Sequence, residues 1–318
     1  MFSTVFDAWP PFAILSWTGL PASPPPPGEF TFVHHEDEGR VLHYRLFIPS
    51  KRSIQPMPLF VMLHGCGQDA ADFARGTGMN TLAEEYGCLV LYPEQSCGAH
   101  WNRCWNWYDR AHQRRGEGEP ALIAGLTRRI MAEHAVDATR VAVAGLSSGG
   151  AMAVILGRTY PDLFSAVGCH SGLAHGSATS SADAMRAMRD GPDPAGLAQA
   201  GSHTGPPVIV FHGDADPMVH RSNSSHVVRQ SVDGHFAHRR DTRVDIAIVE
   251  ETGRTGGRSF TRQIHRKKCG RVLAEEWTVH GTGHVWSGGK PHGSYTDIQG
   301  PNASEEMLRF FITHPATT

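Results

Sequence analysis

The stretch VAVAGLSSGGAM, residues 141–152, decides the fold of this chain. Residues 141–144 are apolar and typical of a strand buried on both faces, and the small residues after Ser147 are typical of a helix packed closely against a sheet. Gly145 and Gly149 lie two residues before and after Ser147. A sharp turn crowds those two positions, so they need residues without bulk. We therefore expect a strand, a tight turn at Ser147 and a helix.

The same alternation continues on both sides of this stretch. Apolar runs predict buried strands at residues 58–65, 88–95, 140–146, 164–172 and 206–216. Helical spacing of apolar residues predicts helices at residues 72–87, 119–136, 148–161, 222–230 and 303–314. Further strands are expected in pairs, one pair within residues 30–49 and the other at 258–266 and 272–281. Strands that alternate with helices predict an α/β fold, with a mostly parallel central sheet and helices on both faces.

Length and composition limit the class of protein. The 318 residues suffice for a large core, and 40% hydrophobic with 19% charged residues is an ordinary globular composition. The net charge of −2 gives no sign of a nucleic-acid partner, and the basic run at residues 266–268 is interpreted as a solvated turn. No apolar stretch reaches the roughly 18 residues of a membrane span, and no obligate protein partner is evident. We expect a tail over residues 1–28 that ends in a proline-rich linker, one α/β domain over 29–318, and a surface insertion or lid at 172–205.

The cysteines and the first residues bear on the compartment. Six cysteines occur and none is spaced as C-x-x-C, so metal-binding spacing is missing. Cys97 and Cys104 bracket an aromatic loop, and a disulfide between them would favour an oxidising compartment. Residues 12–22, FAILSWTGLPA, are similar to the apolar part of a signal peptide, but no Lys or Arg precedes Arg40. We expect secretion, and a cytoplasmic location stays open.

Residues 145–149, GLSSG, match the motif G-x-S-x-G. The motif requires a buried strand before it and a helix after it, and both are expected here. The serine would then stand at the N-terminus of a helix, where free N–H groups and the helix dipole favour negative charge. Ser147 is therefore the candidate nucleophile, and a tight structural turn is the alternative.

A serine nucleophile needs a base, and in hydrolases with this motif the order along the chain is Ser, then Asp or Glu, then His. Asp216 is preferred as the acid, because Asp214 is well placed to cap the turn DADP. His284, in a glycine-flanked loop, is preferred as the general base, because His280 lies inside a strand and His292 lies beyond the glycines. Catalytic groups in open α/β sheets gather at the carboxyl ends of the strands. The three groups are expected to meet at that edge.

The oxyanion of a tetrahedral intermediate needs backbone donors. The N–H of Ser148 follows the nucleophile, and a second donor is expected from the turn LHGCGQD, with Cys66 preferred and Gly67 as the alternative. The Cys66 thiol is then expected to have no role of its own. A disulfide from Cys66 to Cys169 is not expected, because their strands should lie two spacings apart, about 9.6 Å, beyond the roughly 7 Å that a disulfide allows. Cys169, like Cys88, is expected to be a buried free thiol.

The aromatic loop HWNRCWNWYDR, residues 100–110, is the clearest indication of substrate specificity. A flat aromatic wall along the cleft would suit a polyester chain or an aromatic acyl group, and the alternative is that some of these rings belong to the core. The candidate substrate-binding residues are Trp101, Trp105, Trp107 and Trp286. The charged residues expected to brace the loop are Arg115, Glu117 and Glu119. The stretch VHHEDE at 33–38 carries metal-type side chains, but it lies on an edge turn without a second ligand cluster, so no metal site is expected.

Several motifs resemble those of the polyhydroxybutyrate depolymerase family of esterases. They are LHGCGQ, LYPEQ, CWNWY, RRGEGEPALIAGL, AGLSSGGAM, YPDLFSAVGCHSG, FHGDADPMV, GTGHVWSGG and SYTDIQGPNASEEMLRFF, and the resemblance covers about residues 30–314. The resemblance implies the α/β-hydrolase fold and hydrolysis of carboxylic esters through an acyl-serine, without a cofactor. By motif position it implies Ser147 as the nucleophile, Asp216 as its acid partner, His284 as the base, and HGC as part of the oxyanion hole.

The expected function is hydrolysis of a short-chain hydroxyalkanoate polymer or oligomer. Cleavage of feruloyl or acetylxylan esters by the same fold stays open, because no motif separates these substrates. An acyltransferase is a further alternative, and it would need a dry cleft that keeps water from the acyl-enzyme. A non-catalytic binding module is disfavoured, because the serine, the carboxylate and the histidine all occur in order.

Overall fold

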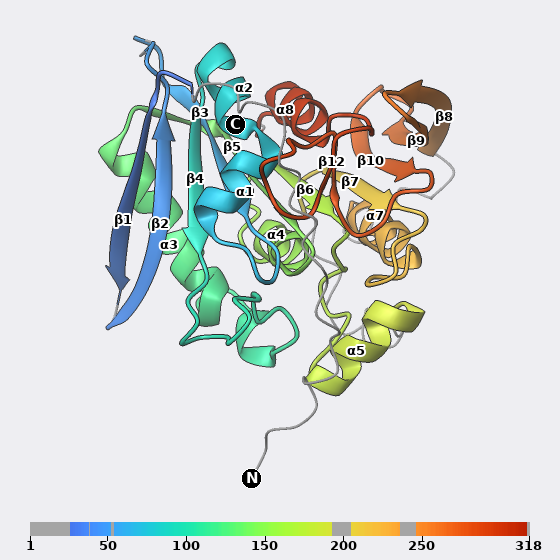
Figure 1. Cartoon of the computed structure of the whole chain (residues 1–318), viewed down its shortest axis with the longest axis horizontal. Coiled ribbons are helices and arrows are strands. Elements are labelled where there is room, and N and C mark those ends of the chain that lie inside the picture. The colour runs from blue at the N-terminus through green and yellow to red at the C-terminus, as the bar shows by residue number, and fades with distance from the viewer. Residues whose placement is uncertain (1–25, 38, 52–53, 193–204, 236–245, 317–318) are drawn as a thin grey trace.

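The computed structural model describes residues 26–37, 39–51, 54–192, 205–235 and 246–316. Within them, ten strands form one sheet in the order β1-β2-β4-β3-β5-β6-β7-β10-β9-β8 (Figure 1). The bounds are β1 Glu29–Asp37, β2 Arg40–Ile48, β3 Met57–Leu63, β4 Leu89–Glu94, β5 Val136–Leu146, β6 Ala166–His170, β7 Val208–Gly213, β8 Ile246–Thr255, β9 Arg258–Lys267 and β10 Val272–Val279. The strands from β4 to β10 in this order are parallel, and antiparallel strands flank them at both edges. The predicted α/β fold is confirmed.

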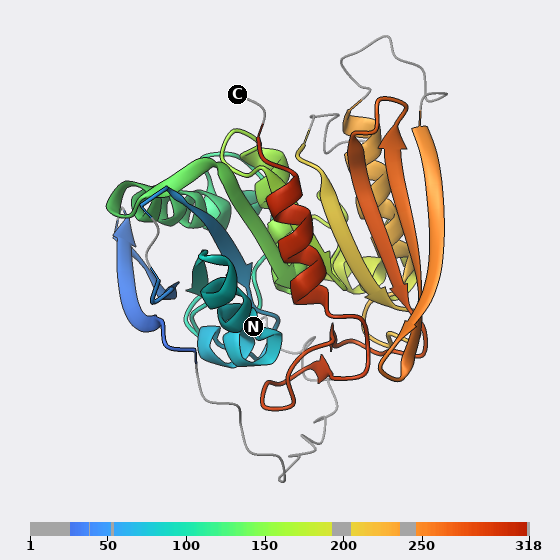
Figure 2. The same cartoon turned by 90° about the horizontal axis from the view of Figure 1, so that it is seen from above.

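Helices cover both faces of this sheet. Their bounds are α1 Ala70–Thr77, α2 Met79–Tyr86, α3 Gly118–Glu133, α4 Ser148–Thr159, α5 Ser181–Asp190, α7 Ser222–Gly234 and α8 Ala303–Thr313, with a short 3₁₀ helix at Arg110–His112. One core cluster joins the sheet to α3, α4 and α7, and a second joins its other face to α1, α2 and α8. Figure 2 shows α8 lying across the middle strands. No helix in the described ranges is long and apolar enough to cross a lipid bilayer.

Two parts of the fold differ from the sequence expectation. The helix expected at 72–87 is two helices, because Gly78 takes a left-handed conformation (φ 64°) and ends α1. The strand β8 was not predicted, although residues 246–249, IAIV, are apolar; most of its side chains face solvent. It forms because β9 offers a full antiparallel partner. The tail expected at 1–28 falls almost wholly outside the described residues, and so do residues 193–204 of the insertion expected at 172–205.

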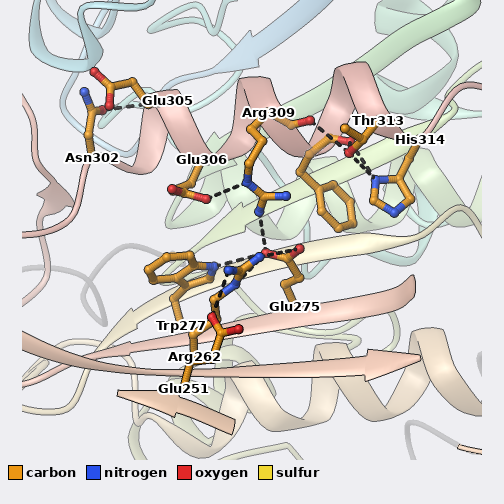
Figure 3. A network of polar contacts seen from close by, with 11 residues as sticks. Glu251, Arg262, Glu275, Trp277, Asn302, Glu305, Glu306, Arg309, Thr313 and His314 are labelled. Carbon is orange, nitrogen blue, oxygen red and sulfur yellow. Dashed lines mark hydrogen bonds and ion pairs between the residues drawn. The ribbon is translucent and has the colours of Figure 1, made fainter. Parts of the chain in front are cut away.

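A buried carboxylate connects α8 to the strands β9 and β10. Glu275 on β10 is 2% exposed, and Figure 3 shows arginines approaching it from two elements. Arg309 of α8 lies 2.6 Å from one carboxylate oxygen, and Arg262 of β9 lies 3.0 Å from the other. Removal of one partner from such a buried ion pair is strongly destabilising, so these contacts fix how α8 sits on the sheet.

Two short strands complete the part of the structure near the carboxyl edge. β11 (Trp286–Ser287) and β12 (Thr296–Asp297) pair in parallel in the chain that follows β10. Because this segment leaves the carboxyl end of β10, it lies at the edge where catalytic groups were expected.

Candidate active site

Ser147 stands at the turn between β5 and α4. Its backbone has φ 56° and ψ −118°, which a residue with a side chain adopts only under strain. A Cβ on Gly145 would lie 2.6 Å from Leu63 O, and a Cβ on Gly149 would lie 2.5 Å from His64 O. Real Cβ atoms do not approach so closely, so both flanking positions need glycine. The strand, tight turn and helix predicted for residues 141–152 are confirmed.

Asp216 and His284 form a hydrogen-bonded pair. His284 Nδ1 lies 2.7 Å from Asp216 Oδ2, and the carboxylate side chain is fully buried. Because a carboxylate only accepts, Nδ1 carries the proton, and Nε2 of the neutral ring is left as a base. Oδ1 accepts the N–H groups of Met218 (2.8 Å) and Val219 (2.9 Å). Burial raises the pKa of Asp216, but hydrogen bonds, first from His212 and then from His284, outweigh it and hold the pKa well below its usual range.

Asp214 makes a second carboxylate–histidine pair close by. Its Oδ2 lies 2.7 Å from His280 Nδ1, and its Oδ1 accepts the N–H of Gly281 at 2.7 Å. The expectation that Asp214 caps the turn DADP is wrong, since the N–H groups of Ala215 and Asp216 in that turn donate to Thr282 O and Gly213 O. Asp214 instead fastens the loop after β7 to the loop after β10, which carries His284.

The turn of Ser147 and the loop of His284 are connected through His170, the last residue of β6. His170 O accepts the N–H of Ser147 at 2.8 Å, and His170 Nε2 accepts the N–H of Ser287 at 3.0 Å. Burial lowers the pKa of His170 to about 3, so its ring is neutral and can accept. The described residues contain no direct hydrogen bond between the Ser147 hydroxyl and His284. In free hydrolases this bond is often long and tightens only with substrate.

The expected oxyanion donors differ in what their N–H groups already bind. Ser148 is the first residue of α4, so its N–H has no acceptor within the helix. The N–H of Gly67 donates to Asn102 O at 2.8 Å and is therefore occupied. The backbone N–H of Cys66 has no hydrogen-bond acceptor among the described residues. This favours Cys66 over Gly67 as the second donor.

A buried polar network supports the turn that carries Cys66. His64 precedes the turn; its Nε2 accepts the N–H of Gln95 at 3.0 Å, and its O accepts Trp105 Nε1 at 3.1 Å. Gln95 Nε2 in turn donates to Glu119 Oε1 at 2.5 Å and to Cys104 O at 3.1 Å. Burial lowers the pKa of His64 to about 4, so the ring stays neutral and accepts. Glu119 braces the aromatic loop, as expected.

The disulfide in this region is Cys66–Cys104. The two Cα atoms are 4.3 Å apart, although 38 positions separate the residues in the sequence. The expected Cys97–Cys104 bridge is wrong, and Cys97 is an exposed free thiol. The expectation that the Cys66 sulfur has no role is wrong too, because it anchors the proposed oxyanion turn to the aromatic loop. The absence of a Cys66–Cys169 bridge is confirmed, and so is the buried, free state of Cys169 and Cys88.

The expectation of an aromatic wall along the cleft is wrong for three of the four tryptophans. Trp105, Trp107 and Trp286 are 1%, 5% and 1% exposed, so they belong to the core. Trp286, for example, stacks on His170 with ring centroids 5.1 Å apart and donates from Nε1 to Ser304 Oγ at 3.0 Å. Burial of their large apolar area stabilises the folded protein, whereas exposure in a wet cleft would not. Trp101 is 62% exposed and stays a candidate for substrate contact.

Metal-type side chains do not gather in the described residues. No group of three or more His, Cys, Asp or Glu there is arranged to hold a metal ion. His35, from the stretch VHHEDE, is buried, and its Nδ1 lies 3.3 Å from Arg129 Nη1. An arginine beside the ring repels a metal cation.

Three residues of the site were missed from the sequence. His170 and His212 end apolar strands beside Ser147 and Asp216, and a polar residue that ends an apolar run is the signal that marks them. His212 Nε2 lies 2.8 Å from Val219 O and 3.3 Å from Asp216 Oδ2. Tyr295, near Gly67, has no marking pattern in the sequence.

Comparison with known proteins assigns the family. Residues 42–245 match the family model described as Esterase PHB depolymerase. The chain belongs to this family. It is 32% identical to Poly(3-hydroxyalkanoate) depolymerase C of Paucimonas lemoignei over 236 residues, which are 71% of this chain and 54% of that protein. It is 30% identical to Feruloyl esterase B of Neurospora crassa over 199 residues, which are 58% of this chain and 67% of that protein.

Solved structures confirm the α/β-hydrolase fold. The acetyl xylan esterase from Aspergillus awamori superimposes with a TM-score of 0.65 at 20% identity, covering 81% of this chain and 94% of that one. At such identity the likeness concerns the fold. The chain spans about half the length of the depolymerase that it matches, 54%.

Proposed function

We propose that this protein hydrolyses carboxylic esters through an acyl-serine intermediate, and that its substrates are oligomers or polymers of short-chain hydroxyalkanoic acids. The observation that carries the proposal is the buried Asp216–His284 pair at the same sheet edge as a strained serine. Membership of the Esterase PHB depolymerase family supports the substrate class.

The first half-reaction forms the acyl-enzyme. Ser147 Oγ attacks the ester carbonyl carbon while His284 Nε2 takes the hydroxyl proton, and the ionised Asp216 stabilises the resulting imidazolium. The carbonyl oxygen becomes an oxyanion held by the N–H groups of Ser148 and Cys66, each worth about 3 kcal/mol in the transition state. The intermediate then collapses, the C–O bond to the alcohol breaks, and the alcohol leaves with the proton from His284.

The second half-reaction releases the acid. His284 takes a proton from water, the resulting hydroxide attacks the acyl carbon, and the bond to Ser147 Oγ breaks as the oxygen recovers the proton. The low pKa of Asp216 suits this cycle, because a carboxylate that stays ionised keeps His284 in the tautomer with Nε2 free. No cofactor takes part in these steps.

Feruloyl or acetylxylan ester hydrolysis is the second candidate. The observation that favours it is the likeness to Feruloyl esterase B and to an acetyl xylan esterase, both named for such substrates. Transfer of the acyl group to an alcohol instead of water is a further alternative with the same first half-reaction.

Two measurements test the function. A fluorophosphonate probe should label the wild-type chain and fail to label Ser147→Ala, because only an activated serine reacts with it. Release of 3-hydroxybutyrate, ferulate and acetate from their esters then separates the substrate classes, and added alcohol acceptors reveal acyl transfer. An unlabelled wild-type chain, correctly folded, would falsify the acyl-serine mechanism.

The compartment is part of the proposal. A structural disulfide forms and persists in an oxidising environment, and Cys66–Cys104 joins two segments of the proposed site. We therefore propose that the protein acts outside the cytoplasm, where insoluble or polymeric esters are met. Detection of the protein in the culture medium or periplasm, with this disulfide formed, tests the compartment.

A further inference from the structure

Tyr295 has a strained backbone next to the proposed oxyanion turn. Its φ is 52°, and its side chain is 43% exposed. A non-glycine residue in this region costs of order 1–3 kcal/mol and persists when its surroundings fix it, which happens most often at functional sites. The strain therefore calls for a cause, and the neighbouring residues supply one.

Hydrogen bonds fix Ser294, the residue before Tyr295, and the backbone of Tyr295 itself. Ser294 Oγ donates to Asp72, and the N–H of Ser294 donates to Asp72 Oδ1 at 3.2 Å. Gln68 Nε2 donates to Ser294 O at 3.1 Å, while Gln68 Oε1 accepts the N–H of Gly65 at 2.9 Å. Gln68 thus connects the segment of Tyr295 directly to the turn that carries Cys66. Tyr295 O also accepts the N–H of Trp286 at 2.7 Å.

The side chain of Tyr295 reaches the same turn. A Cβ placed on Gly67 would lie 3.8 Å from Tyr295 Oη and 3.5 Å from Asn102 Oδ1. In the described part of the chain the tyrosine hydroxyl has no hydrogen-bond partner, so it is available to a ligand. Trp101, which is 62% exposed, lies next to Asn102 in the chain. Tyr295 and the segment that carries Trp101 therefore approach the turn from separate parts of the chain.

We propose that Tyr295 is a substrate-binding residue that contacts the ester chain beyond the bond being cleaved. Its hydroxyl donates a hydrogen bond to a second carbonyl oxygen of the chain, and its ring, with that of Trp101, covers the adjoining carbon atoms. The substrate class is then an oligoester with at least two ester units. This inference rests on the proposed function and adds the preference for chains over single esters.

The test compares a long with a short substrate. Tyr295→Phe removes the hydroxyl, Tyr295→Ala removes the ring as well, and Tyr86→Phe is the control, since Tyr86 is 56% exposed at the end of α2. We expect kcat/KM on the 3-hydroxybutyrate trimer to fall about five- to tenfold in Tyr295→Phe, the effect of one lost hydrogen bond, and further in Tyr295→Ala. On nitrophenyl acetate the fall should be much smaller, and Tyr86→Phe should match the wild type on both.

Each outcome decides the matter. Equal falls on the trimer and on acetate, or no fall on the trimer in Tyr295→Phe, would overturn the inference. Thermal unfolding of each variant shows whether a loss reflects the fold instead. A wild-type chain that neither reacts with fluorophosphonate nor cleaves any ester overturns the proposed function itself, and this inference falls with it.

A separate observation concerns His212, the residue before Gly213 at the end of β7. Its side chain is buried, and Nε2 lies 2.8 Å from Val219 O and 3.3 Å from Asp216 Oδ2. A carbonyl oxygen only accepts, so this assigns the proton to Nε2, and the same N–H is shared with the carboxylate. The titratable groups around it are Asp216, His284 and His170.

We infer that His212 is a positioning residue, which holds Asp216 so that Oδ2 faces His284 and Oδ1 receives the N–H groups of the turn. The contact also spreads the negative charge of Asp216 over a second donor. Loss of that donor leaves more charge on the oxygen that faces His284, so the imidazolium is favoured and the acid limb of the kcat profile moves to higher pH.

The test uses two substitutions of similar size. His212→Leu removes the N–H, whereas His212→Gln keeps a donor at the same reach. We expect kcat of His212→Leu to fall about ten- to a hundredfold with KM little changed and the acid limb at higher pH, and His212→Gln to recover most of the loss. If both variants lose the same activity, in step with a lower unfolding temperature and with an unmoved pH profile, His212 only packs the strand and the inference is wrong.

Discussion

Among single residues, Asp214 and Asp216 show how different surroundings give two identical side chains different roles. Each accepts a histidine Nδ1 at 2.7 Å, but Asp216 is fully buried whereas Asp214 is 30% exposed. Burial makes the charge of Asp216 act strongly on His284, because little water screens it. The exposed pair is screened and mainly fastens the two loops.

The two aspartates can therefore be separated by matched substitutions. Asp216→Asn should lower kcat by roughly 10³- to 10⁴-fold, because an amide lets His284 take the wrong tautomer. Asp214→Asn makes the same chemical change two residues away and should cause a far smaller loss. Ester hydrolysis under saturating substrate measures both, and comparable losses would contradict the assignment of Asp216.

The buried His170 predicts a pH dependence of stability. Burial lowers its pKa from 6.5 to about 3. Between these two pH values His170 is protonated in the unfolded chain but neutral in the folded chain. Acidification therefore favours unfolding, and the free energy of unfolding should fall by about 1.4 kcal/mol per pH unit from this residue. In His170→Phe the slope between pH 6 and 4 should be flatter by that amount. Urea unfolding across that range checks it, and an unchanged slope would mean that His170 titrates in the folded state.

Among the elements, the turn at Ser147 depends on how closely α4 approaches β3. The missing side chains of Gly145 and Gly149 let two backbones meet, and the backbone of Ser147 absorbs the strain. The close approach also places the first N–H of α4 beside Ser147, the proposed nucleophile. Local sequence and packing agree here, which explains why this element could be predicted.

A methyl group at this contact should be costly. Gly149→Ala places a Cβ against His64 O, so we expect about 2–3 kcal/mol lower stability and loss of fluorophosphonate labelling. Gly98→Ala is the matched control, because a Cβ there meets only Ser96 Oγ at 3.8 Å. Chemical denaturation of both variants gives the comparison. Equal stabilities would show that the turn relaxes freely.

At the scale of the whole molecule, four neighbouring strands bring the site together. Ser147 follows β5, His170 ends β6, Asp216 follows β7 and His284 follows β10, and these strands are adjacent in the sheet. The Cys66–Cys104 disulfide adds a covalent connection between the turn after β3 and the aromatic loop. The site is thus assembled from distant parts of the chain at one edge.

The disulfide should matter for both stability and activity. Closing a loop of 38 positions stabilises the folded chain by about 4 kcal/mol in the chain-entropy description. The double variant Cys66→Ser/Cys104→Ser should lose about that much and also lose kcat, because the turn that carries the Cys66 N–H is released. Cys97→Ser, at an exposed free thiol, is the control and should unfold like the wild type. A double variant with full activity would show that the turn is held by its polar network instead.

Sequence patterns sufficed where the cause is local. The glycines around Ser147 and the alternation of apolar runs arise from neighbours in the chain, and they predicted the α/β fold and the turn at Ser147. The Asp216–His284 pair was predicted from the order of serine, aspartate and histidine in hydrolases with the G-x-S-x-G motif. The break at Gly78 was missed because helical spacing continues across it. The strand β8 was missed because its stability comes from its partner β9.

The sequence alone was enough for the α/β fold and the strand–turn–helix at Ser147, since periodicity and short-range sterics set these. The hydrolase type of the fold and the loops that carry Asp216 and His284 followed from the family resemblance and the order of the motifs. Only the tertiary structure decided that Cys66 pairs with Cys104, that three tryptophans enter the core, and that Tyr295 and His212 adjoin the site. Except for His212 and Asp216, which are four positions apart, these contacts join residues far apart in the chain, and they depend on how strands and loops pack in space. No local sequence pattern predicts how these segments pack together.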